Sequence, residues 1–274
     1  MVGHVEWIEF GRVDHVPVPG EIVHVSEAWQ EPAGGGAVAA MQLCKLAGAA
    51  TLYTALGDDE TGHRTKQELE ALGLRVEAVF RPEPQRRGFV HIDEAGERTI
   101  TVIGSRLGPR AEDPLPWQDL SDTDAVYFTA GDAGAARAAR QAGTLVSTAR
   151  GMPTLAEAGV QLDALVASSS DAGERYSPGD LDPPPLHVVR TAGAAGGEYE
   201  TLGGESGRWE ATPLPGPISD SYGCGDSFAA GLTFGLGSGL PVGEAAELAA
   251  RCGAACLTGR GPYEGQLRSG REVR

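Results

Sequence analysis

Lysine is almost missing from this chain. Only two of its 274 residues are lysine, Lys45 and Lys66. Neither lies in a G-x-x-x-x-G-K-[ST] loop, which excludes a P-loop of the Walker type, and neither context suggests a Schiff-base lysine. The six histidines are scattered and form no H-E-x-x-H pair, so the sequence does not indicate a zinc hydrolase.

Cysteine and long apolar runs are also scarce. The four cysteines fit no zinc-binding or disulfide-framework spacing. We therefore expect reduced, mostly buried thiols in a cytoplasmic protein. The N-terminus lacks a basic region followed by an apolar run, and no stretch is apolar for long enough to cross a bilayer. The sequence predicts no membrane segment and no membrane partner.

The charge is strongly one-sided. The formal net charge is -16, while 41% of the residues are apolar, enough for a folded core. A surface this acidic repels nucleic acid and anionic membranes. We therefore expect a small-molecule substrate or a protein partner, and no nucleic-acid partner.

The second half of the chain alternates short apolar strands with helix-like stretches. Strands are expected at 125–128, 144–147, 164–167 and 187–190, and helices at 133–142, 154–159, 226–237 and 243–258. This alternation predicts an α/β fold with a doubly wound, mostly parallel sheet flanked by helices.

The first half is richer in β patterns. Strands are expected at 2–13, 22–25 and 50–56, with a small-residue helix at 37–46 after a flexible glycine loop. Residues 87–92 and 98–103 alternate on both sides of a turn, which is typical of a β-hairpin. Residues of about 10–30 and 86–105 are therefore predicted to form a small β lid over the site, within one domain that spans residues 1–274.

A glycine-rich turn leads into the first of the two C-terminal helices. It reads Gly223-Cys224-Gly225-Asp226. Glycines let backbone N–H groups converge, and a helix N-terminus adds partial positive charge, so the turn predicts an anion hole for a phosphate. An aspartate in a first turn can simply stabilise its helix. Beside an anion hole, however, Asp226 can accept the proton of a hydroxyl that attacks a γ-phosphoryl group.

The segment Asp220-Ser221-Tyr222-Gly223-Cys224-Gly225-Asp226 resembles the D-T-x-G-A-G-D signature of the ribokinase-like (PfkB) family of carbohydrate kinases. The resemblance implies a ribokinase-like fold, ATP and Mg²⁺ as cofactors, and phosphoryl transfer to a hydroxyl of a sugar or sugar-like molecule. It implies that Asp226 is the catalytic base and that the backbone from Gly223 through Cys224 and Gly225 forms the anion hole. It also implies a monovalent cation at Asp220.

The resemblance extends along nearly the whole chain. It implies substrate binding by Asp14, which precedes Pro17 and Pro19-Gly20-Glu21, and by Gly34 and Gly35. Thr191, Gly193 and Gly196 resemble the T-x-G-x-x-G loop that holds nucleotide phosphates, and Glu174 resembles the glutamate of an N-x-x-E motif that works through water and magnesium. The site residues that the resemblance implies outside the glycine-rich turn are therefore Asp14, Gly34, Gly35, Glu174, Thr191, Gly193 and Gly196.

Two positions depart from the family pattern. Val38 stands where an asparagine usually bonds a sugar hydroxyl, and Asp171 stands where N-x-x-E has asparagine. A further carboxylate near phosphates requires a metal or a neighbouring cation. Arg87 and Arg106 have two interpretations, as exposed charges of the lid or as anion-binding residues.

Several alternatives remain open at this point. A nucleoside kinase of the same fold fits the less polar pocket that Val38 implies, and so does a non-catalytic nucleotide- or metabolite-binding relative. The block around Ser227 superficially resembles the G-D-S-L block of some esterases, but no histidine follows His187 to serve as its base. No G-x-G-x-x-G follows the first strand, so a dinucleotide-dependent dehydrogenase is not indicated. Lid strands can pair across a dimer, and the resemblance is compatible with a homodimer.

Overall fold

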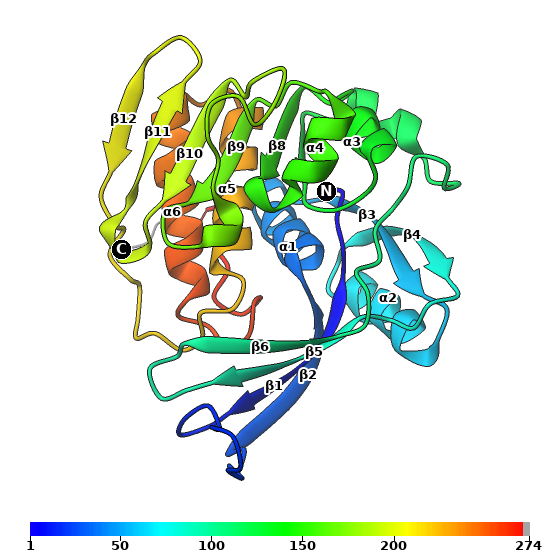
Figure 1. Cartoon of the computed structure of the whole chain (residues 1–274), viewed down its shortest axis with the longest axis vertical. Helices are drawn as coiled ribbons and strands as arrows, with labels where there is room; N and C mark the ends of the chain where they lie inside the picture. The colour runs from blue at the N-terminus through cyan, green and yellow to red at the C-terminus, as the bar shows by residue number, and fades with distance from the viewer. Residues whose placement is uncertain (271–274) are drawn as a thin grey trace.

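A large sheet forms the centre of the molecule. The computed structural model describes residues 1–270. Six strands follow the order β12-β11-β10-β9-β8-β7 (Figure 1). Their bounds are β7 (Ala125–Phe128), β8 (Thr144–Thr148), β9 (Ala164–Ser168), β10 (His187–Thr191), β11 (Gly197–Thr201) and β12 (Ser206–Trp209). The strands from β7 to β10 are parallel, and the β11–β12 hairpin adds two antiparallel strands at one edge.

A single residue extends this sheet. Strands β3 (Thr51–Gly57) and β4 (Arg75–Arg81) form a parallel pair. Val2 bridges to Tyr53 of β3 and to Phe128 of β7, in parallel on both sides. The Val2 N–H donates to the Tyr127 carbonyl at 3.0 Å, and its carbonyl accepts from Thr129 N–H at 2.9 Å. The N-terminal segment therefore joins the two groups of strands in a mostly parallel arrangement.

Helices cover both faces of the sheet. They are α1 (Gly35–Ala47), α2 (Glu60–Ala71), α3 (Ala133–Ala139), α4 (Met152–Ala158), α5 (Cys224–Gly237) and α6 (Val242–Cys256). Successive strand residues point to opposite faces. Val146 thus packs in one apolar cluster with α1, α5 and α6, whereas Leu145 packs in the other with α3 and α4. The predicted doubly wound α/β architecture is confirmed, and the solved structures compared below share it.

A second sheet lies below the first in Figure 1. Its strand order is β2-β1-β5-β6, from β1 (Glu6–Arg12), β2 (Glu27–Ala33), β5 (Arg87–Ile92) and β6 (Arg98–Ile103). β5 and β6 form the predicted hairpin, with the same bounds. β1 pairs with β5 in parallel and with β2 in an antiparallel manner. Segments from both ends of the first hundred residues therefore meet in one sheet.

Four strand assignments differ from the sequence-based expectation. The strand predicted at 22–25 is wrong, because Ile22 is 86% exposed and the second strand is β2, which begins at Glu27. Its register is set by pairing with β1, where Arg12 faces Glu27. Pro32 and Ala33, predicted as part of a flexible loop, end β2. The β4 strand and the β11–β12 hairpin were not predicted.

The apolar helices are short. Among the described residues, the longest apolar stretches of helix do not reach the length needed to cross a membrane.

Candidate active site

The glycine-rich turn opens α5 with free backbone donors. Gly223, the residue before the helix, has φ +81°, a left-handed conformation that favours glycine. A Cβ at this position would lie 2.9 Å from Cγ1 of Val38. No side chain caps the helix, so the first N–H groups of α5 have no intrahelical partner. Open space surrounds the Cα of Gly225. The turn therefore presents amide donors and room for an anion.

Asp226 lies in the first turn of α5 and is half-buried. Its Oδ1 would be 2.8 Å from a Cβ built on Gly35. Desolvation by burial raises the pKa of Asp226 to about 6; Arg98 opposes this shift, while Glu174 and Glu6 add to it. The carboxylate is therefore mostly ionised at neutral pH and is a stronger proton acceptor than an ordinary aspartate.

Gly34 and Gly35 bring the start of α1 against the first strand. The Gly34 N–H donates to the Tyr222 hydroxyl at 3.1 Å. A Cβ on Gly34 would lie 3.1 Å from Cγ of Glu6, and one on Gly35 would lie 3.5 Å from Cε1 of His4. The two glycines therefore lie among His4, Glu6 and Asp226. Two of the predicted site segments meet here, although they are nearly 200 residues apart in the sequence.

Sequence reasoning missed two titratable residues of the first strand region, His4 and Glu6. Glu6 is buried, and its Oε1 lies 2.7 Å from Nε of Arg86. Burial raises the pKa of the Glu6 carboxyl, and the Arg86 guanidinium counters this. Burial lowers the pKa of His4 to about 3, with Arg106, Arg86 and Arg150 acting in the same direction. A glutamate among the apolar residues of β1 was the available signal, because a buried charge requires a partner or a ligand.

A tight loop follows β10. Thr191, Gly193 and Gly196 all lie at the carboxyl end of this strand, as the sequence predicted. The Ala192 N–H donates to the Gly196 carbonyl at 2.8 Å, which closes the loop on itself. Gly196 has φ +80°, and a Cβ there would collide with the Trp209 carbonyl of β12. Glycine at position 196 thus lets the loop pack against β12, whereas a Cβ on Gly193 would have no atom within 4 Å.

Two carboxylates follow β9. Asp171 and Glu174 both form ion pairs with Arg150, which follows β8. Arg150 is the neighbouring cation that the extra carboxylate at position 171 requires. Carboxylate oxygens suit Mg²⁺, which usually keeps water and phosphate oxygens as its other ligands. Among residues 1–270, no three His, Cys, Asp or Glu side chains are grouped closely enough to hold a metal ion by themselves.

The comparisons with known proteins agree with this geometry. The family model for pfkB family carbohydrate kinases matches residues 1–169 and 184–268. The chain belongs to the pfkB family. It is therefore a kinase, a phosphotransferase that acts on a hydroxyl group, and the resemblance predicted from its motifs is confirmed.

Individual relatives cover most of the chain. An ATP-dependent ribose-1-phosphate kinase of Halopiger xanaduensis is 28% identical over 273 residues, which cover 92% of this chain and 89% of the relative. The solved ribokinase of Thermotoga maritima superposes with a TM-score of 0.78 at 19% identity, covering 97% of this chain and 95% of the other. The nucleoside kinase of Methanocaldococcus jannaschii has a TM-score of 0.71 at 15% identity, with coverage of 97% and 93%. These structures show the ribokinase-like fold.

In this pfkB-family chain, Asp220 is fully buried, and both of its carboxylate oxygens accept hydrogen bonds from backbone N–H groups. Its Oδ1 accepts from the Tyr222 N–H at 2.8 Å, and its Oδ2 accepts from the Gly261 N–H at 3.1 Å. Burial raises the pKa of Asp220, and the two amide donors oppose this. Burial also raises the pKa of Cys224, so this thiol in the turn stays neutral. Asp220 therefore holds the segment that precedes the anion hole in place.

The small sheet contacts the same segment. The Ser221 N–H donates to the Gly96 carbonyl at 2.9 Å, and Nη1 of Arg98 donates to the Ser221 carbonyl at 2.8 Å. At the same end of the sheet, where Arg12, Ile92 and Arg98 lie in one row across the strands, Nη1 of Arg12 donates to the Ser219 carbonyl at 3.0 Å. The β5–β6 hairpin and β1 are thus attached directly to the residues that lead into α5.

Three sequence candidates lie elsewhere or have other neighbours. Asp14 is exposed in the segment between β1 and β2, and within residues 1–270 it forms no hydrogen bond or ion pair with the other candidates. Figure 1 shows this segment projecting from the end of the small sheet. Val38 is fully buried against Gly223. Ser227 is also fully buried, and its Oγ accepts from Nε2 of Gln266, so it is not placed to act as a nucleophile.

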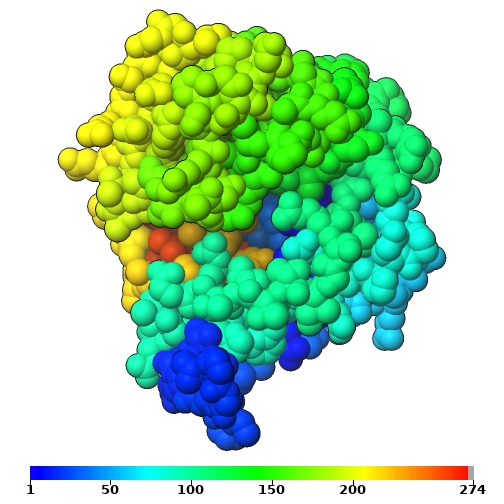
Figure 2. Space-filling model, in the orientation of Figure 1, coloured from blue at the N-terminus to red at the C-terminus, as the bar shows by residue number. Residues whose placement is uncertain are grey.

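A hollow separates the two sheets. Figure 2 shows it between the teal atoms of the β5–β6 region and the green and yellow atoms of the large sheet, with blue and orange atoms at its floor. These floor colours belong to the N-terminal and C-terminal parts of the chain.

Proposed function

We propose that the chain is an ATP-dependent kinase that transfers the γ-phosphoryl group to a hydroxyl of a sugar or sugar-like small molecule, with Asp226 as general base. One observation carries this proposal. Asp226 lies against Gly35, and the uncapped N-terminus of α5 begins beside it. The relative from Halopiger xanaduensis, which is named an ATP-dependent kinase, supports ATP as the phosphoryl donor.

Asp226 accepts one proton in the proposed reaction. The acceptor oxygen forms a bond to the γ-phosphorus, the bond from that phosphorus to the β–γ bridging oxygen breaks, and the hydroxyl proton passes to the carboxylate. The amides of Gly223, Cys224, Gly225 and Asp226 are aimed at the negative charge of the transferring group. A base with a pKa of about 6 is mostly ionised at neutral pH and binds a proton more strongly than an ordinary aspartate.

The nucleotide phosphates are assigned to the loop of Thr191, Gly193 and Gly196. Its left-handed glycines let backbone groups approach phosphate oxygens, which supports this assignment. Glu174 is proposed to act on Mg²⁺ through water, with Asp171 beside it. Mg²⁺, when bound with ATP, neutralises charge on the β- and γ-phosphates. Arg150 holds both carboxylates in position at the carboxyl end of the sheet.

The acceptor is assigned to the space between Gly34, Gly35 and the small sheet. Glu6 supplies a buried carboxylate there that can accept hydrogen bonds from hydroxyl groups. Asp14 as a substrate ligand stays a prediction. The apolar Val38 makes no hydrogen bond to a sugar, and this observation keeps a nucleoside kinase as the second candidate. Binding of a monovalent cation by Asp220 also stays a prediction.

The four-stranded sheet is proposed to act as the lid of a single domain over residues 1–274. The hydrogen bonds of Arg12, Gly96 and Arg98 to residues 219–221 support this role, because they connect the sheet to the catalytic turn. Strand β6 is an edge strand whose residues are all exposed, among them Ile100, Val102 and Ile103. Exposed apolar edge strands favour pairing with another strand, so we propose a homodimer through the lid.

A panel of acceptors tests the kinase activity. ADP production is measured with ATP and Mg²⁺ against sugars, polyols, sugar phosphates and nucleosides, and each active acceptor is repeated with Asp226→Asn. We expect at least one acceptor to give turnover that this substitution removes. If every acceptor fails while ATP still binds, the chain is a non-catalytic nucleotide-binding relative. If nucleosides are clearly preferred as acceptors, the chain is a nucleoside kinase and not a sugar kinase.

A further inference from the structure

A pocket of about 470 Å³ beside the proposed acceptor site is rich in arginine. The chain carries 38 acidic and 22 basic residues, so arginines should be the minority charge in an average part of its surface. Four arginines nevertheless line this one pocket, together with the acidic residues Glu83 and Asp132. They are Arg81, Arg106, Arg110 and Arg150. The side chains that line this pocket thus carry more positive than negative charges, which is the reverse of the whole chain, and an arginine without an acidic partner among them attracts an anion.

Three of these arginines already have partners. Nη2 of Arg81 lies 2.6 Å from Oδ2 of Asp113, and Arg150 pairs with Asp171 and Glu174. Arg110 lies 3.8 Å from Glu112. Within the described part of the chain, the guanidinium of Arg106 forms no ion pair. Arg106 is thus the arginine of this pocket whose planar set of donors is available to a ligand.

Buried polar atoms around the pocket also lack partners. Thr129 lines it and is 6% exposed, and its Oγ1 has no hydrogen-bond partner. Nδ1 of His4, which is 9% exposed, likewise has no hydrogen-bond partner among residues 1–270. Native structures leave few buried polar atoms without a partner, and a ligand is one common explanation. Because His4 has a pKa of about 3, its ring is neutral and one nitrogen can donate a hydrogen bond.

The pocket belongs to the acceptor side of Asp226. His4 and Asp226 both lie against Gly35, and Arg106 and Arg150 act on the charge of His4. The pocket is lined by residues that follow β7 and β8, such as Thr129 and Gly151. The loop assigned to the nucleotide phosphates follows β10, which is separated from β7 by β8 and β9. The residues after β7 are therefore three strand spacings, about 14 Å, from that loop, and those after β8 are two spacings, about 10 Å, from it.

From these observations we infer that the acceptor already carries a phosphate group, which binds to Arg106 in this pocket while the attacking hydroxyl lies at Asp226. The inference deepens the proposed function and rests on it. A guanidinium matches two phosphate oxygens at once, and Thr129 and His4 supply further hydrogen bonds. A neutral sugar leaves these groups unpaired, so the pocket selects a sugar phosphate over the sugar itself.

The first test compares ribose with its 1-phosphate and 5-phosphate esters as acceptors in the ADP-release assay. We expect kcat/KM for one of the phosphate esters to exceed that for ribose by about 100-fold. Arg106→Gln should raise KM for that ester by about 10- to 100-fold and leave KM for ATP unchanged. Arg106→Lys keeps the charge without the planar fork and should give an intermediate KM. Arg106 is exposed, so these variants should fold.

The matched control is Arg87→Gln. Arg87 is an exposed arginine of β5 that lines a different pocket, with Trp7 and Arg64, and its loss should not change KM for the phosphate ester. Asp226-dependent turnover that favours ribose would overturn the inference and leave the kinase assignment intact. An effect of Arg106→Gln on KM for ATP instead would also overturn it, because the anion would then be the γ-phosphate.

A binding measurement decides the inference without turnover. Calorimetric titration of the nucleotide-free protein with ribose 5-phosphate, ribose 1-phosphate and inorganic phosphate should detect binding that Arg106→Gln weakens at least about tenfold. Equal binding by the wild type and this variant, or no binding by either, would overturn the inference. If binding depends on Arg106 but no acceptor gives Asp226-dependent ADP release, the kinase proposal fails while the anion site remains supported.

Discussion

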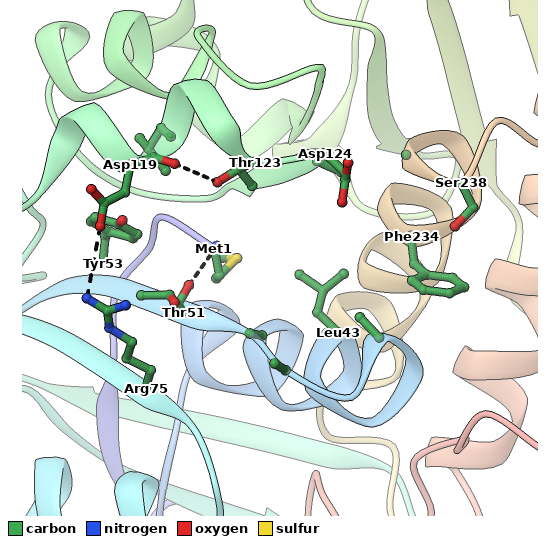
Figure 3. A pocket seen from close by; sticks show the side chains of 16 residues that line it. Met1, Leu43, Thr51, Tyr53, Arg75, Asp119, Thr123, Asp124, Phe234 and Ser238 are labelled. Atoms are coloured by element: carbon green, nitrogen blue, oxygen red, sulfur yellow. Dashed lines mark hydrogen bonds and ion pairs between the residues drawn. The ribbon is translucent and has the colours of Figure 1, made fainter.

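The two ends of the large sheet differ, although the same two helices, α1 and α5, run from one end to the other. At the carboxyl end, α1 and α5 begin, and their N-termini lie beside Gly35 and Asp226. At the amino end the same helices finish, and Ala47 and Gly237 line a pocket of about 330 Å³. Figure 3 shows this amino-end pocket, with Arg75 beside Asp119 and with Leu43 and Phe234 opposite.

The two ends of the sheet differ in which helix termini they contain. Helix N-termini carry unpaired N–H groups and partial positive charge, whereas C-termini present carbonyl oxygens. A phosphate is therefore favoured at the carboxyl end of the sheet and disfavoured at the amino end. The shape of a pocket alone does not make this distinction, because both ends are hollowed. Substitutions matched between the two ends can test whether the chemistry is confined to one of them.

The largest effect is expected from Asp226→Asn. An amide keeps the size of the side chain but cannot take the proton, so kcat should fall by about 10²- to 10⁴-fold with little change in KM for ATP. Asp124→Asn, the same exchange in the amino-end pocket, serves as the control. Steady-state kinetics of both variants check the expectation. Comparable losses of kcat in the two would contradict the assignment of Asp226.

Gly35→Ala tests how closely the two helix starts must approach. The added Cβ would lie 2.8 Å from Oδ1 of Asp226, so the carboxylate has to move. A displaced base can cost about 10²-fold in kcat. Gly48→Ala, at the other end of α1, is the matched control: Gly48 has φ +84° and open space around it, so alanine should lower thermal stability without lowering kcat. A kcat near the wild-type value for Gly35→Ala would show that this contact is not needed.

A smaller effect is expected from pH. The pKa of Asp226 is raised to about 6, so the carboxylate is lost as the pH falls through this value. The ratio kcat/KM should therefore be nearly constant from pH 7 to 8 and fall about tenfold by pH 5, with a slope of one. The pH profile of the wild type measures this, and ATP binding at each pH controls for unfolding. An acid limb centred near pH 4 would indicate that burial does not raise the pKa of Asp226.

The smallest effect is expected at the amino end. Arg75→Gln removes an exposed arginine whose Nε lies 2.8 Å from Oε1 of Glu77 and whose Nη2 lies 4.0 Å from Asp119. Exposed ion pairs contribute little, and no helix N-terminus points at this pocket. Neither kcat nor KM should change by more than about twofold in the kinetic assay. A large change in KM for ATP would indicate that the nucleotide binds at the amino end of the sheet, and would contradict our assignment.

The parts that the sequence predicted well are those with local signals. The strands from β7 to β10 follow from short apolar runs between helices, and the β5–β6 hairpin follows from alternation on both sides of a turn. The segment from Gly223 to Asp226 and the loop from Thr191 to Gly196 were singled out by short motifs that resemble those of the family, and their roles stay predictions. In each case the information lies within about a dozen residues.

The remaining parts depend on contacts between distant residues. Ile22 to Val25 alternate like a strand, yet β1 pairs with residues 27–33 instead, and pairing outweighs local propensity. Glu6 and His4 could not be recognised as neighbours of Asp226, because only the folded chain brings residue 35 between them. The arginine pocket is assembled from residues 81 to 154, without any motif of its own.

Val2, the residue that joins the two groups of strands, also affects how the chain folds. It pairs with Tyr53 and Phe128, so the middle of the sheet closes only after two long loops of chain have been brought together. The next residues along are His4 and Glu6, which means that the step that completes the sheet also delivers both side chains to Gly34 and Gly35. A folding intermediate in which Val2 is not yet paired can contain formed helices and hairpins, but it has no acceptor site.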